Sequence, residues 1–599
     1  MSSYHLNRRD LDFLLFDWLK IEDLLGRERF AEHSRETLAA VLDLSEDLAA
    51  DAFVPAYKPA DQREPWLDND GVHVIPEIAD AVRAYAAAGL TAGSFDADLG
   101  GLQAPIVAAT ASMACFMAAN ISASAFPMLT MANARLIATF GSPAQVEAFA
   151  RPQIEGAALG TMCLSEPQAG SSLADISTLA QPDGEDALGA RYRLRGGKMW
   201  ISGADHDITG NIVHLVLAKT PGPDGKPLPG VKGISLFIAP KVLADGSRND
   251  VVVTGLNHKM GYRGIPNTVL AFGDGAHTPG GRSGAIGYLV GEVGQGLAQM
   301  FQMMNEARIN VGLGAAMLAY RGYRQSLAYA QERLQGRPGG ASAPAPIIGH
   351  PDVRAMLLAQ KAYAEGAIAL SLYCARLLDE EQTGEPTARE TARRLLDLLT
   401  PAAKTWPSEM GLAANDLAIQ IHGGYGYTRD FDVEQIYRDN RLNPIHEGTT
   451  GVQGIDLVGR KLARDPAALA ELRTRMEATA AKAQAHPDLA PCAAALRAAF
   501  DRLDAFAGTI ETPLSPKALS GATSALRAFG HAVVAWLWLD MATAARTPAA
   551  EALGDDAFLA GKVAACRFFF EQEVPRIALW LDLAATGSDS VLAIPDEGF

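Results

Sequence analysis

The chain is short of cysteine and of basic charge, and each shortage excludes a class of protein. Its 599 residues include five cysteines, none paired at the spacing of a metal site or a disulfide framework, which predicts reduced thiols and no bound metal. Lysine and arginine number 52 against 69 acidic residues, a net charge of −17. Such a surface repels phosphate backbones, which argues against nucleic acid as a general partner but is compatible with a local basic site for a phosphorylated ligand.

Long apolar runs are missing as well. The stretch from Met1 to Leu19 carries five charged side chains, so it lacks the uncharged apolar core of a signal peptide. Near the C-terminus the longest apolar run is Ala532–Leu539, which ends at Asp540 and is too short to cross a bilayer. We therefore expect a soluble, cytoplasmic protein without a transmembrane segment.

The apolar and polar residues that are present have the balance of a large globular protein. Hydrophobic residues make up 48% and charged residues 20%, and the length predicts three or more domains. Apolar residues recur at helical spacing up to about residue 160, short β-rich runs fill 192–274, and long helical patterns return from Gly296. The middle region is typical of an antiparallel sheet or barrel, and the stretches 297–333, 350–379 and 388–421 of an antiparallel helical bundle.

Two motifs lie at strand-like positions. Met162–Ser172 runs from a β-like start into a Pro/Gly turn with hydroxyl residues, whose amides and hydroxyls can hold the polar edge of a planar cofactor. Lys198–Gly203 contains a Trp followed by Ser, which could cover an aromatic ring system while the Ser donates a hydrogen bond. Taken alone, each is more often an ordinary strand-to-loop transition or a core Trp.

Two glycine-rich segments border the helical patterns. Gly291–Gly296 lacks the spacing of a P-loop or dinucleotide fingerprint and is interpreted as a helix entry. Arg308, in the helix that follows, requires a partner such as a carboxylate or a phosphate. Gly423 and Gly424, in the segment Ile421–Thr428, allow a backbone to approach a ligand closely, for example a pyrophosphate.

One carboxylate is a candidate base. Glu447, in the segment Ile445–Gln453, lies among apolar residues and small turn formers before a further helix. A carboxylate in a dry pocket has a raised pKa, which makes it a competent base near neutral pH. An exposed glutamate that caps the helix is an equally good interpretation of this segment alone.

Together and in this order, the five segments resemble the acyl-CoA dehydrogenase family over about residues 36–465. The resemblance implies an α+β fold with an N-terminal helical domain, a central β-barrel or sandwich and a helical bundle. The helical lead-in and the additional C-terminal helical domain resemble bacterial members of about this length, which act on fatty acyl-CoA or 3-methylthiopropionyl-CoA. The expected parts are 1–35, 36–160, 161–280, 281–465 with the catalytic base, and 466–599.

The resemblance also implies residue roles. Glu447 matches the catalytic base of most of the family. The residues expected to bind FAD are Cys163, Leu164 and Ser165 at the isoalloxazine, Trp200 and Ser202 packed on the flavin, Arg333 at the diphosphate of a neighbouring subunit's FAD, Gln420, Gly423 and Gly424 along that FAD, and Thr449. The residues expected to meet the acyl-CoA are Ser171, Arg308 and Gly448. An FAD site shared in this way implies a homodimer or a higher homo-oligomer.

Two departures from the family's pattern affect the acyl pocket. His446 replaces the usual aromatic residue before the base, where it could tune the pKa of Glu447 or fill the same space, and Gly451 replaces a frequent Gln. One branch of the family takes its base from the residue before the conserved Arg, which is Ala307 here. Glu306 lies one residue further, and that step rotates a helical side chain by about 100°, so Glu447 is favoured.

The expected reaction is the FAD-dependent α,β-dehydrogenation of a fatty acyl-CoA to the trans-2-enoyl-CoA, a step of β-oxidation. By resemblance, Glu447 removes the α-proton, hydride passes to flavin N5, and electrons leave through an electron-transferring flavoprotein. Three alternatives stay open: a 3-methylthiopropionyl-CoA dehydrogenase, an acyl-CoA oxidase, and a non-catalytic DNA-associated flavoprotein. The region from Glu471 to Phe599 has 11 basic and 16 acidic residues, which argues against DNA binding.

Overall fold

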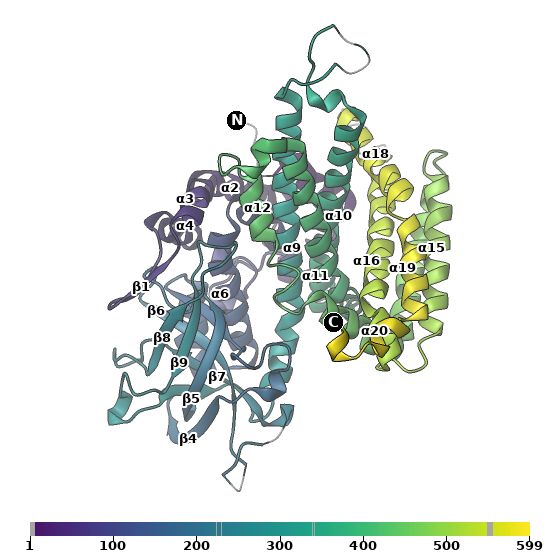
Figure 1. Cartoon of the computed structure of the whole chain (residues 1–599). Helices are drawn as coiled ribbons and strands as arrows, with labels where there is room; N and C mark the ends of the chain where they lie inside the picture. The colour runs from purple at the N-terminus through teal and green to yellow at the C-terminus, as the bar shows by residue number, and fades with distance from the viewer. Residues whose placement is uncertain (1–5, 223–224, 229, 338–339, 341, 548–554) are drawn as a thin grey trace. The chain divides into compact units, whose positions relative to one another are not determined.

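The computed structural model describes residues 6–222, 225–228, 230–337, 340, 342–547 and 555–599 (Figure 1). The chain separates into two compact units. We call them the barrel unit, Val41–Ala104 with Ala119–Ala307, and the bundle unit, Met1–Ala40 with Pro105–Ala118 and Arg308–Phe599. Helices, then strands, then helices follow one another along the chain, so the predicted α+β class is confirmed.

The barrel unit is built around a sheet of eight strands. They are β3 (Ala158–Cys163), β4 (Leu179–Asp186), β5 (Gly189–Ser202), β6 (Asn211–Lys219), β7 (Ile234–Pro240), β8 (Val251–Leu256), β9 (Asn267–Phe272) and β10 (Ala285–Leu289). Their order is β10-β7-β6-β4-β5-β9-β8, with β3 paired to β6. Because β10 also pairs with β5, the ring β10-β7-β6-β4-β5 closes on itself and has no free edge. The sequence predicted this region as a sheet or barrel.

Two strands from before residue 192 pair in parallel with β6, outside the region predicted as antiparallel. β3 pairs with β6 over six residues, from Ala158 opposite Asn211 to Cys163 opposite Val216, and β4 pairs with β6 at Leu179 and Lys219. A parallel pair needs a long crossover, and the loop after Cys163 together with the β4–β5 hairpin provides it. The strand β3 therefore runs beside β6, whose residues from Ile212 to Ala218 are buried.

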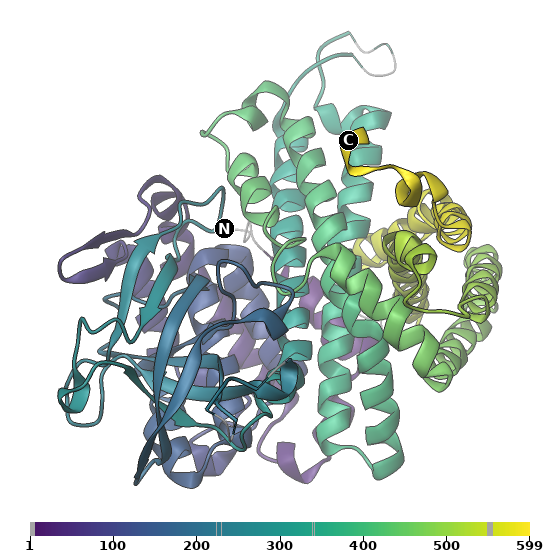
Figure 2. The same ribbon diagram turned by 60° about the horizontal axis from the view of Figure 1, so that its bottom comes forward.

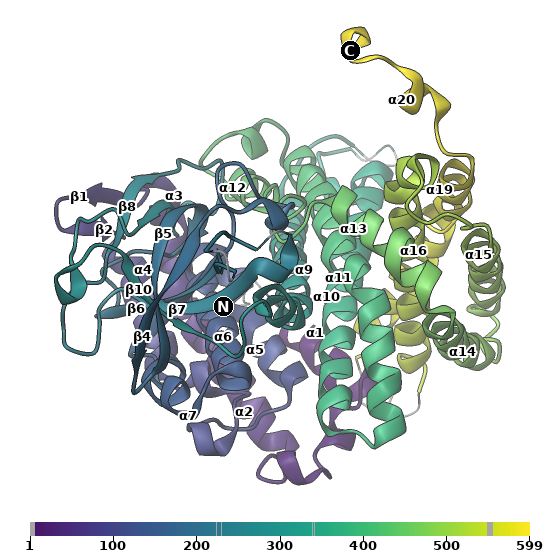
Figure 3. The ribbon, with the colours of Figure 1, turned by 90° about the horizontal axis from the view of Figure 1, so that it is seen from below.

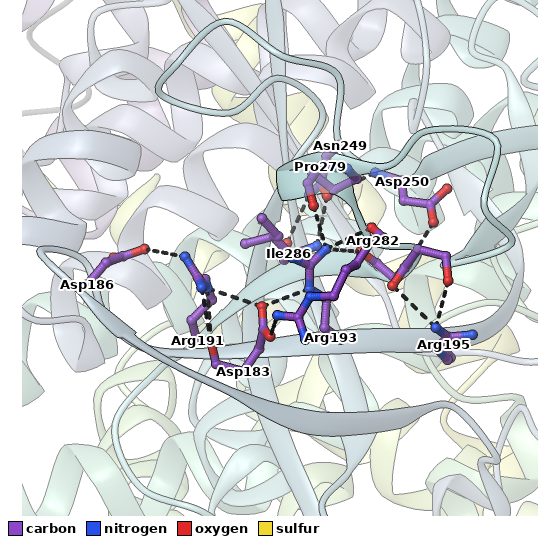
Figure 4. Close-up of polar contacts among 12 residues, drawn as sticks. Asp183, Asp186, Arg191, Arg193, Arg195, Asn249, Asp250, Pro279, Arg282 and Ile286 are labelled. Carbon is purple, nitrogen blue, oxygen red and sulfur yellow. Dashed lines mark hydrogen bonds and ion pairs between the residues drawn. The ribbon is translucent and has the colours of Figure 1, made fainter.

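A polar cluster joins β4 and β5 to the loop before β10 (Figure 4). The Arg193 side chain is bonded through Nε to Asp183 at 2.7 Å, and one of its terminal nitrogens donates to the carbonyl of Pro279 at 2.9 Å. Asn249 exchanges two hydrogen bonds with the backbone of Ile286, at 2.9 and 2.8 Å. These groups satisfy one another's hydrogen-bonding capacity where the barrel closes, and this fixes the register of β10 against β5.

Helices of the barrel unit cover the sheet. They are α3 (Val54–Gln62), α4 (Pro76–Ala87), α6 (Ile121–Phe140), the short α7 (Pro143–Gln145) and α8 (Arg151–Ile154), with a small hairpin of β1 (Trp66–Asp68) and β2 (Gly71–His73). On α6, the buried Asn133 amide donates to the carbonyls of Thr161 in β3 and Val213 in β6, both at 2.9 Å. The helix thereby holds the two parallel strands together. The helix α2 (Arg35–Leu48) spans the boundary between the units.

Long helices form the bundle unit, as the sequence predicted. They are α9 (Gly296–Glu332), α10 (Pro351–Thr383) and α11 (Pro386–His422), joined by α1 (Arg8–Asp12), α5 (Ile106–Ala119), α12 (Val433–Asn440) and α13 (Thr450–Asp456). Figures 1 and 3 show α10 and α11 side by side along their length. The helix α9 begins in the barrel unit and continues from Arg308 in the bundle unit. The segment that carries the predicted base, Glu447, lies between α12 and α13.

The C-terminal helices pack on this bundle (Figure 2). They are α14 (Pro466–Ala483), α15 (Ala490–Gly508), α16 (Pro516–Ala544), α18 (Asp556–Gln572), α19 (Pro575–Thr586) and α20 (Asp589–Ala593). The apolar run Ala532–Leu539 is the buried centre of α16, and Asp540 after it accepts hydrogen bonds of 2.8 Å from Trp18 and Thr479. Among the described residues, every helix is too short or too polar to cross a membrane.

A buried ion cluster ties the first helix to the last part of the chain. The Lys562 ammonium, on α18, lies 2.8 Å from a carboxylate oxygen of Asp10 and 2.8 Å from one of Glu365. Tyr320 donates to Asp10, and Lys361 pairs with Glu365. Because an unpaired buried charge is strongly destabilising, the cluster requires α1, α9, α10 and α18 to stay together.

Candidate active site

Glu447 lies in the loop between α12 and α13 with a left-handed backbone. Its φ is +52°, and Gly448 after it has φ +94°. A non-glycine residue held in this region is strained by ~1–3 kcal/mol, and such strain concentrates at functional sites. Two buried side chains hold the loop: Gln453 donates to the carbonyl of Glu447 at 3.1 Å, and Lys404 donates to the carbonyl of Gly448 at 2.6 Å. The next residue, Thr449, caps the N-terminus of α13.

The carboxyl of Glu447 has the electrostatics of a base. Protein atoms crowd around it, and this desolvation raises its pKa, while the positive charges of Arg308 and Lys404 act in the opposite direction. The residue as a whole still has exposed surface, so the loop that carries it lies at the surface. A reachable carboxylate with a raised pKa can take a proton from a weak carbon acid.

His446 is a neutral member of a polar chain. Burial, and then the charge of Lys404, lower its pKa to about 3. Its Nε2 lies 3.0 Å from the Asn443 side-chain oxygen, Asn443 donates to Asn440 at 2.8 Å, and Asn440 donates to Asn415 at 2.6 Å. This direction of donation makes Asn443 an acceptor, so Nε2 of His446 carries the proton. Of the two interpretations of His446, space filling is the one favoured.

Arg308 has a carboxylate partner within the bundle unit. Its guanidinium lies 3.3 Å from Asp456 on α13, and both side chains are buried. The predicted contact with CoA stays a prediction, because the sequence allowed either a carboxylate or a phosphate partner. Glu306, the rival base, forms an ion pair of 3.2 Å with Arg135 in the barrel unit. The Glu306 carboxylate thus has a structural partner, which favours Glu447.

In the barrel unit, the two strand motifs are joined to each other. The Lys198 ammonium donates to the carbonyl of Leu164 at 3.0 Å, and the amide of Met199 donates to the carbonyl of Ser165 at 3.0 Å. These two bonds fix the backbone of Leu164 and Ser165, just beyond the end of β3, against β5. Both segments were predicted from the sequence as cofactor contacts, and the structure brings them together. Cys163 ends β3 with its thiol buried, and burial raises the pKa of that thiol to about 12, which excludes a thiolate role near neutral pH.

A buried ion pair under these motifs was missed by the sequence interpretation. Lys198 and Glu166 lie 2.9 Å apart, and both side chains are almost fully buried. Glu166 also accepts hydrogen bonds from the backbone and hydroxyl of Ser177 and of Thr178. Burial alone would raise the pKa of Glu166, but Lys198 and these donors lower it to about 2. The sequence signal was one Glu in the first motif and one Lys in the second.

Trp200 lies at an irregularity of β5. The pairing of β5 with β9 shifts between Met199 and Ile201, and Trp200 between them has φ +68° and is 57% exposed. An exposed indole held by a strained backbone is available to cover a planar ring. Ser202 follows on the same strand and is within 3.4 Å of the Asn267 amide. Ser171 is exposed in the loop after β3.

A third group of predicted residues gathers at one end of the bundle unit. Arg333 follows the end of α9, and its guanidinium lies 5.8 Å from the centre of the Tyr425 ring, in the glycine turn after α11. Arg333, Gln420, Gly423 and Gly424 are all exposed. Gly423 has φ +61°, and a Cβ at either glycine would meet open space. An exposed guanidinium beside accessible backbone fits the diphosphate of FAD.

Three family models match successive parts of the chain. The model of the acyl-CoA dehydrogenase middle domain matches residues 161–274, that of the acyl-CoA dehydrogenase C-terminal domain 294–463, and that of an acetyl-CoA dehydrogenase C-terminal-like domain 472–595. The chain is 34% identical over 591 residues to the 3-methylmercaptopropionyl-CoA dehydrogenase of Ruegeria pomeroyi, covering 95% of this chain and 96% of that one.

Two further similarities extend over the chain. It is 32% identical over 639 residues to a broad-specificity linear acyl-CoA dehydrogenase of Mycobacterium tuberculosis, with 100% of both chains covered. The crystal structure of an acyl-CoA dehydrogenase complexed with FAD from Bacillus anthracis shares the fold, with a TM-score of 0.73 and 20% identity, over 97% of this chain and 93% of that one.

The family models and the relatives define an FAD-dependent oxidoreductase that acts on CH–CH bonds. The chain belongs to the acyl-CoA dehydrogenase family.

Proposed function

We propose that this protein oxidises a saturated linear acyl-CoA to the trans-2-enoyl-CoA, with Glu447 as the base. The observation that carries the proposal is the state of the Glu447 carboxyl. Burial raises its pKa, and the residue lies in a left-handed loop at the surface. The competing carboxylate, Glu306, is paired with Arg135. The segments that match the family's FAD and acyl-CoA contacts are present in both units.

Different residues of this chain have different roles in the proposed reaction. Glu447 takes the α-proton, and its backbone N–H polarises the thioester carbonyl, which makes that proton more acidic. Leu164, Ser165 and Trp200 orient the flavin ring, and Arg333 with the glycine turn binds a diphosphate. FAD, when bound there, would supply the acceptor for the hydride of the β-carbon. Holding the thioester in one orientation supplies much of the rate.

Two substrate classes are supported by the similarities. The relatives are a linear acyl-CoA dehydrogenase and a 3-methylmercaptopropionyl-CoA dehydrogenase. A 3-methylthiopropionyl chain has the length of a pentanoyl chain with sulfur in place of one methylene. We therefore propose a linear acyl-CoA as substrate, with the sulfur-containing analogue as the second candidate.

Anaerobic titration of the flavin absorbance near 450 nm with acyl-CoAs of increasing length, and with 3-methylthiopropionyl-CoA, tests this function. Bleaching by one range of chain lengths is the expected result and names the substrate class. A flavoprotein that none of these thioesters bleaches would contradict the proposal and favour the non-catalytic alternative. In that case retention on DNA at low salt becomes the informative assay.

The partners follow from the same proposal. Arg333, Gln420, Gly423 and Gly424 would bind the FAD of a second subunit, so the working form is a homodimer or a higher oligomer. Electrons would leave through an electron-transferring flavoprotein rather than to oxygen. Stoichiometric hydrogen peroxide in air would instead identify an oxidase. The cytoplasmic location stays a prediction of the sequence.

A further inference from the structure

A buried lysine lies beside the proposed base, and the mechanism has not used it. Lys404, on α11, is 0% exposed, which is rare for lysine because burying an ammonium is costly unless it is paired. Its ammonium donates to the backbone carbonyl of Gly448 at 2.6 Å. A lysine that only filled space would be replaced by methionine at lower cost, so its charge and its hydrogen bond call for a function.

The geometry gives Lys404 control of the backbone at the base. Gly448 directly follows Glu447, and both residues have positive φ. The carbonyl of Glu447 is held by Gln453, and that of Gly448 by Lys404. Two successive carbonyls are therefore fixed by two buried side chains from different helices. Without the lysine, the strained loop would lose the bond on the C-terminal side of the base.

Charge gives Lys404 a second effect on the same residue. Burial first, and then the charge of Arg308, lower the pKa of Lys404 to about 8, while Glu447 and Glu409 oppose this. The ammonium is therefore mostly charged at neutral pH, and it favours the ionised form of Glu447 against desolvation. The charged and titratable groups around it are Glu409 on α11, Arg308 on α9 with its partner Asp456 on α13, Arg527 on α16 through Glu409, and His446 with Glu447 in the loop.

We propose that Lys404 is a positioning residue for the base: its ammonium fixes the left-handed loop through the Gly448 carbonyl and places a positive charge beside that loop. The inference rests on the proposed function, because it assigns Lys404 a role through Glu447. It predicts that rate and pH dependence change while acyl-CoA affinity stays nearly the same.

The test is the rate of anaerobic flavin reduction by acyl-CoA, measured by stopped flow from pH 5 to pH 9. Lys404→Met removes the charge and the hydrogen bond at similar volume, and we expect the limiting rate to fall about 10- to 100-fold. Without the nearby positive charge the pKa of Glu447 rises. The acid limb of the pH–rate profile, where the rate falls as Glu447 is protonated, therefore moves to higher pH. Lys404→Arg keeps the charge, so its acid limb should stay near that of the wild type.

A matched control is Lys461→Met, which removes a lysine of the bundle unit that pairs with Asp397. It should reduce flavin at the wild-type rate. A Lys404→Met protein with the wild-type limiting rate and acid limb would overturn the inference. If that variant does not retain FAD, Lys404→Arg decides, and an acid limb displaced as far as one pH unit would overturn the charge role.

Failure of the inference differs from failure of the proposed function. If wild type is bleached by acyl-CoA and Glu447→Gln is not, the function stands, and only the Lys404 variants decide the inference. If Glu447→Gln is reduced as fast as wild type, the base itself is misassigned and Lys404 loses its proposed target.

Discussion

The buried ion pair of Lys198 and Glu166 offers a prediction whose magnitude can be worked out. In Lys198→Met, the Glu166 carboxylate would keep its donors from Ser177 and Thr178 but lose the ammonium 2.9 Å away. Removing one partner of a buried pair leaves an uncompensated charge and destabilises a protein by ~3–5 kcal/mol. The same change removes the bond from Lys198 to the carbonyl of Leu164, next to the expected flavin contact.

The pKa of Glu166 supports a similar magnitude. It falls from 4.5 to about 2, and this difference corresponds to about 3 kcal/mol of stabilisation of the folded barrel unit. Because the folded-state value is the lower one, the stabilisation is present above pH 4.5 and is lost as the pH falls through about 2. For a cooperative unit of this size, ~2–4 °C of Tm corresponds to each kcal/mol, so a loss of about 3 kcal/mol lowers Tm by about 6–12 °C.

The assay is thermal unfolding at pH 7 followed by FAD fluorescence, together with the FAD content of the purified variant. Lys198→Met should melt about 6–12 °C lower and retain FAD poorly. The matched control is Arg195→Met on the same strand, because Arg195 is exposed and its guanidinium donates to Ser283. A Lys198→Met protein that melts with the wild type and holds FAD fully would refute the reasoning.

Three further predictions follow from other parts of the structure. His446→Phe should leave the acid limb of flavin reduction in place, because a His with a pKa of about 3 is already neutral, and a displaced limb in stopped flow would contradict this. Arg333→Ala should weaken FAD binding about 10- to 100-fold with little change in the unfolding of apoprotein, and equilibrium dialysis would show unchanged affinity if the diphosphate role is wrong. Lys562→Met should destabilise the bundle unit by ~3–5 kcal/mol, because Asp10 and Glu365 lose their shared cation, and circular dichroism melting equal to that of the exposed control Lys482→Met would disprove it.

Local pattern was sufficient for most helices and strands. Apolar spacing predicted 297–333, 350–379 and 388–421, and the structure has α9, α10 and α11 over nearly the same residues. The β-rich runs predicted within 192–274 include the residues of β6, β7, β8 and β9. The parallel pairing of β3 with β6 was not predicted, because strand direction depends on the path of the chain between them and leaves no periodic signal in either strand.

Most candidate site residues were named through the resemblance, although Glu447 was also singled out by its local sequence. Glu447, Trp200 and Arg333 were named as candidates, whereas Glu166, Lys198 and Lys404 were not assigned a role. A buried charge is recognised by its partner, and the partners of these residues lie 32 positions apart for Glu166 and Lys198 and 44 positions apart for Lys404 and Gly448. The neutral state of His446 likewise depends on Asn443 and on burial, which the sequence does not display.

The central claim is that Glu447 is the base, and one measurement tests it most directly. Single-turnover flavin reduction by a saturated acyl-CoA is followed for wild type, Glu447→Gln and the matched control Glu306→Gln, all loaded with FAD. We predict that Glu447→Gln loses at least about 100-fold in rate while Glu306→Gln stays near wild type, because removing a general base costs about 10²–10⁴-fold. Reduction of the Glu447→Gln flavin at the wild-type rate would contradict the account.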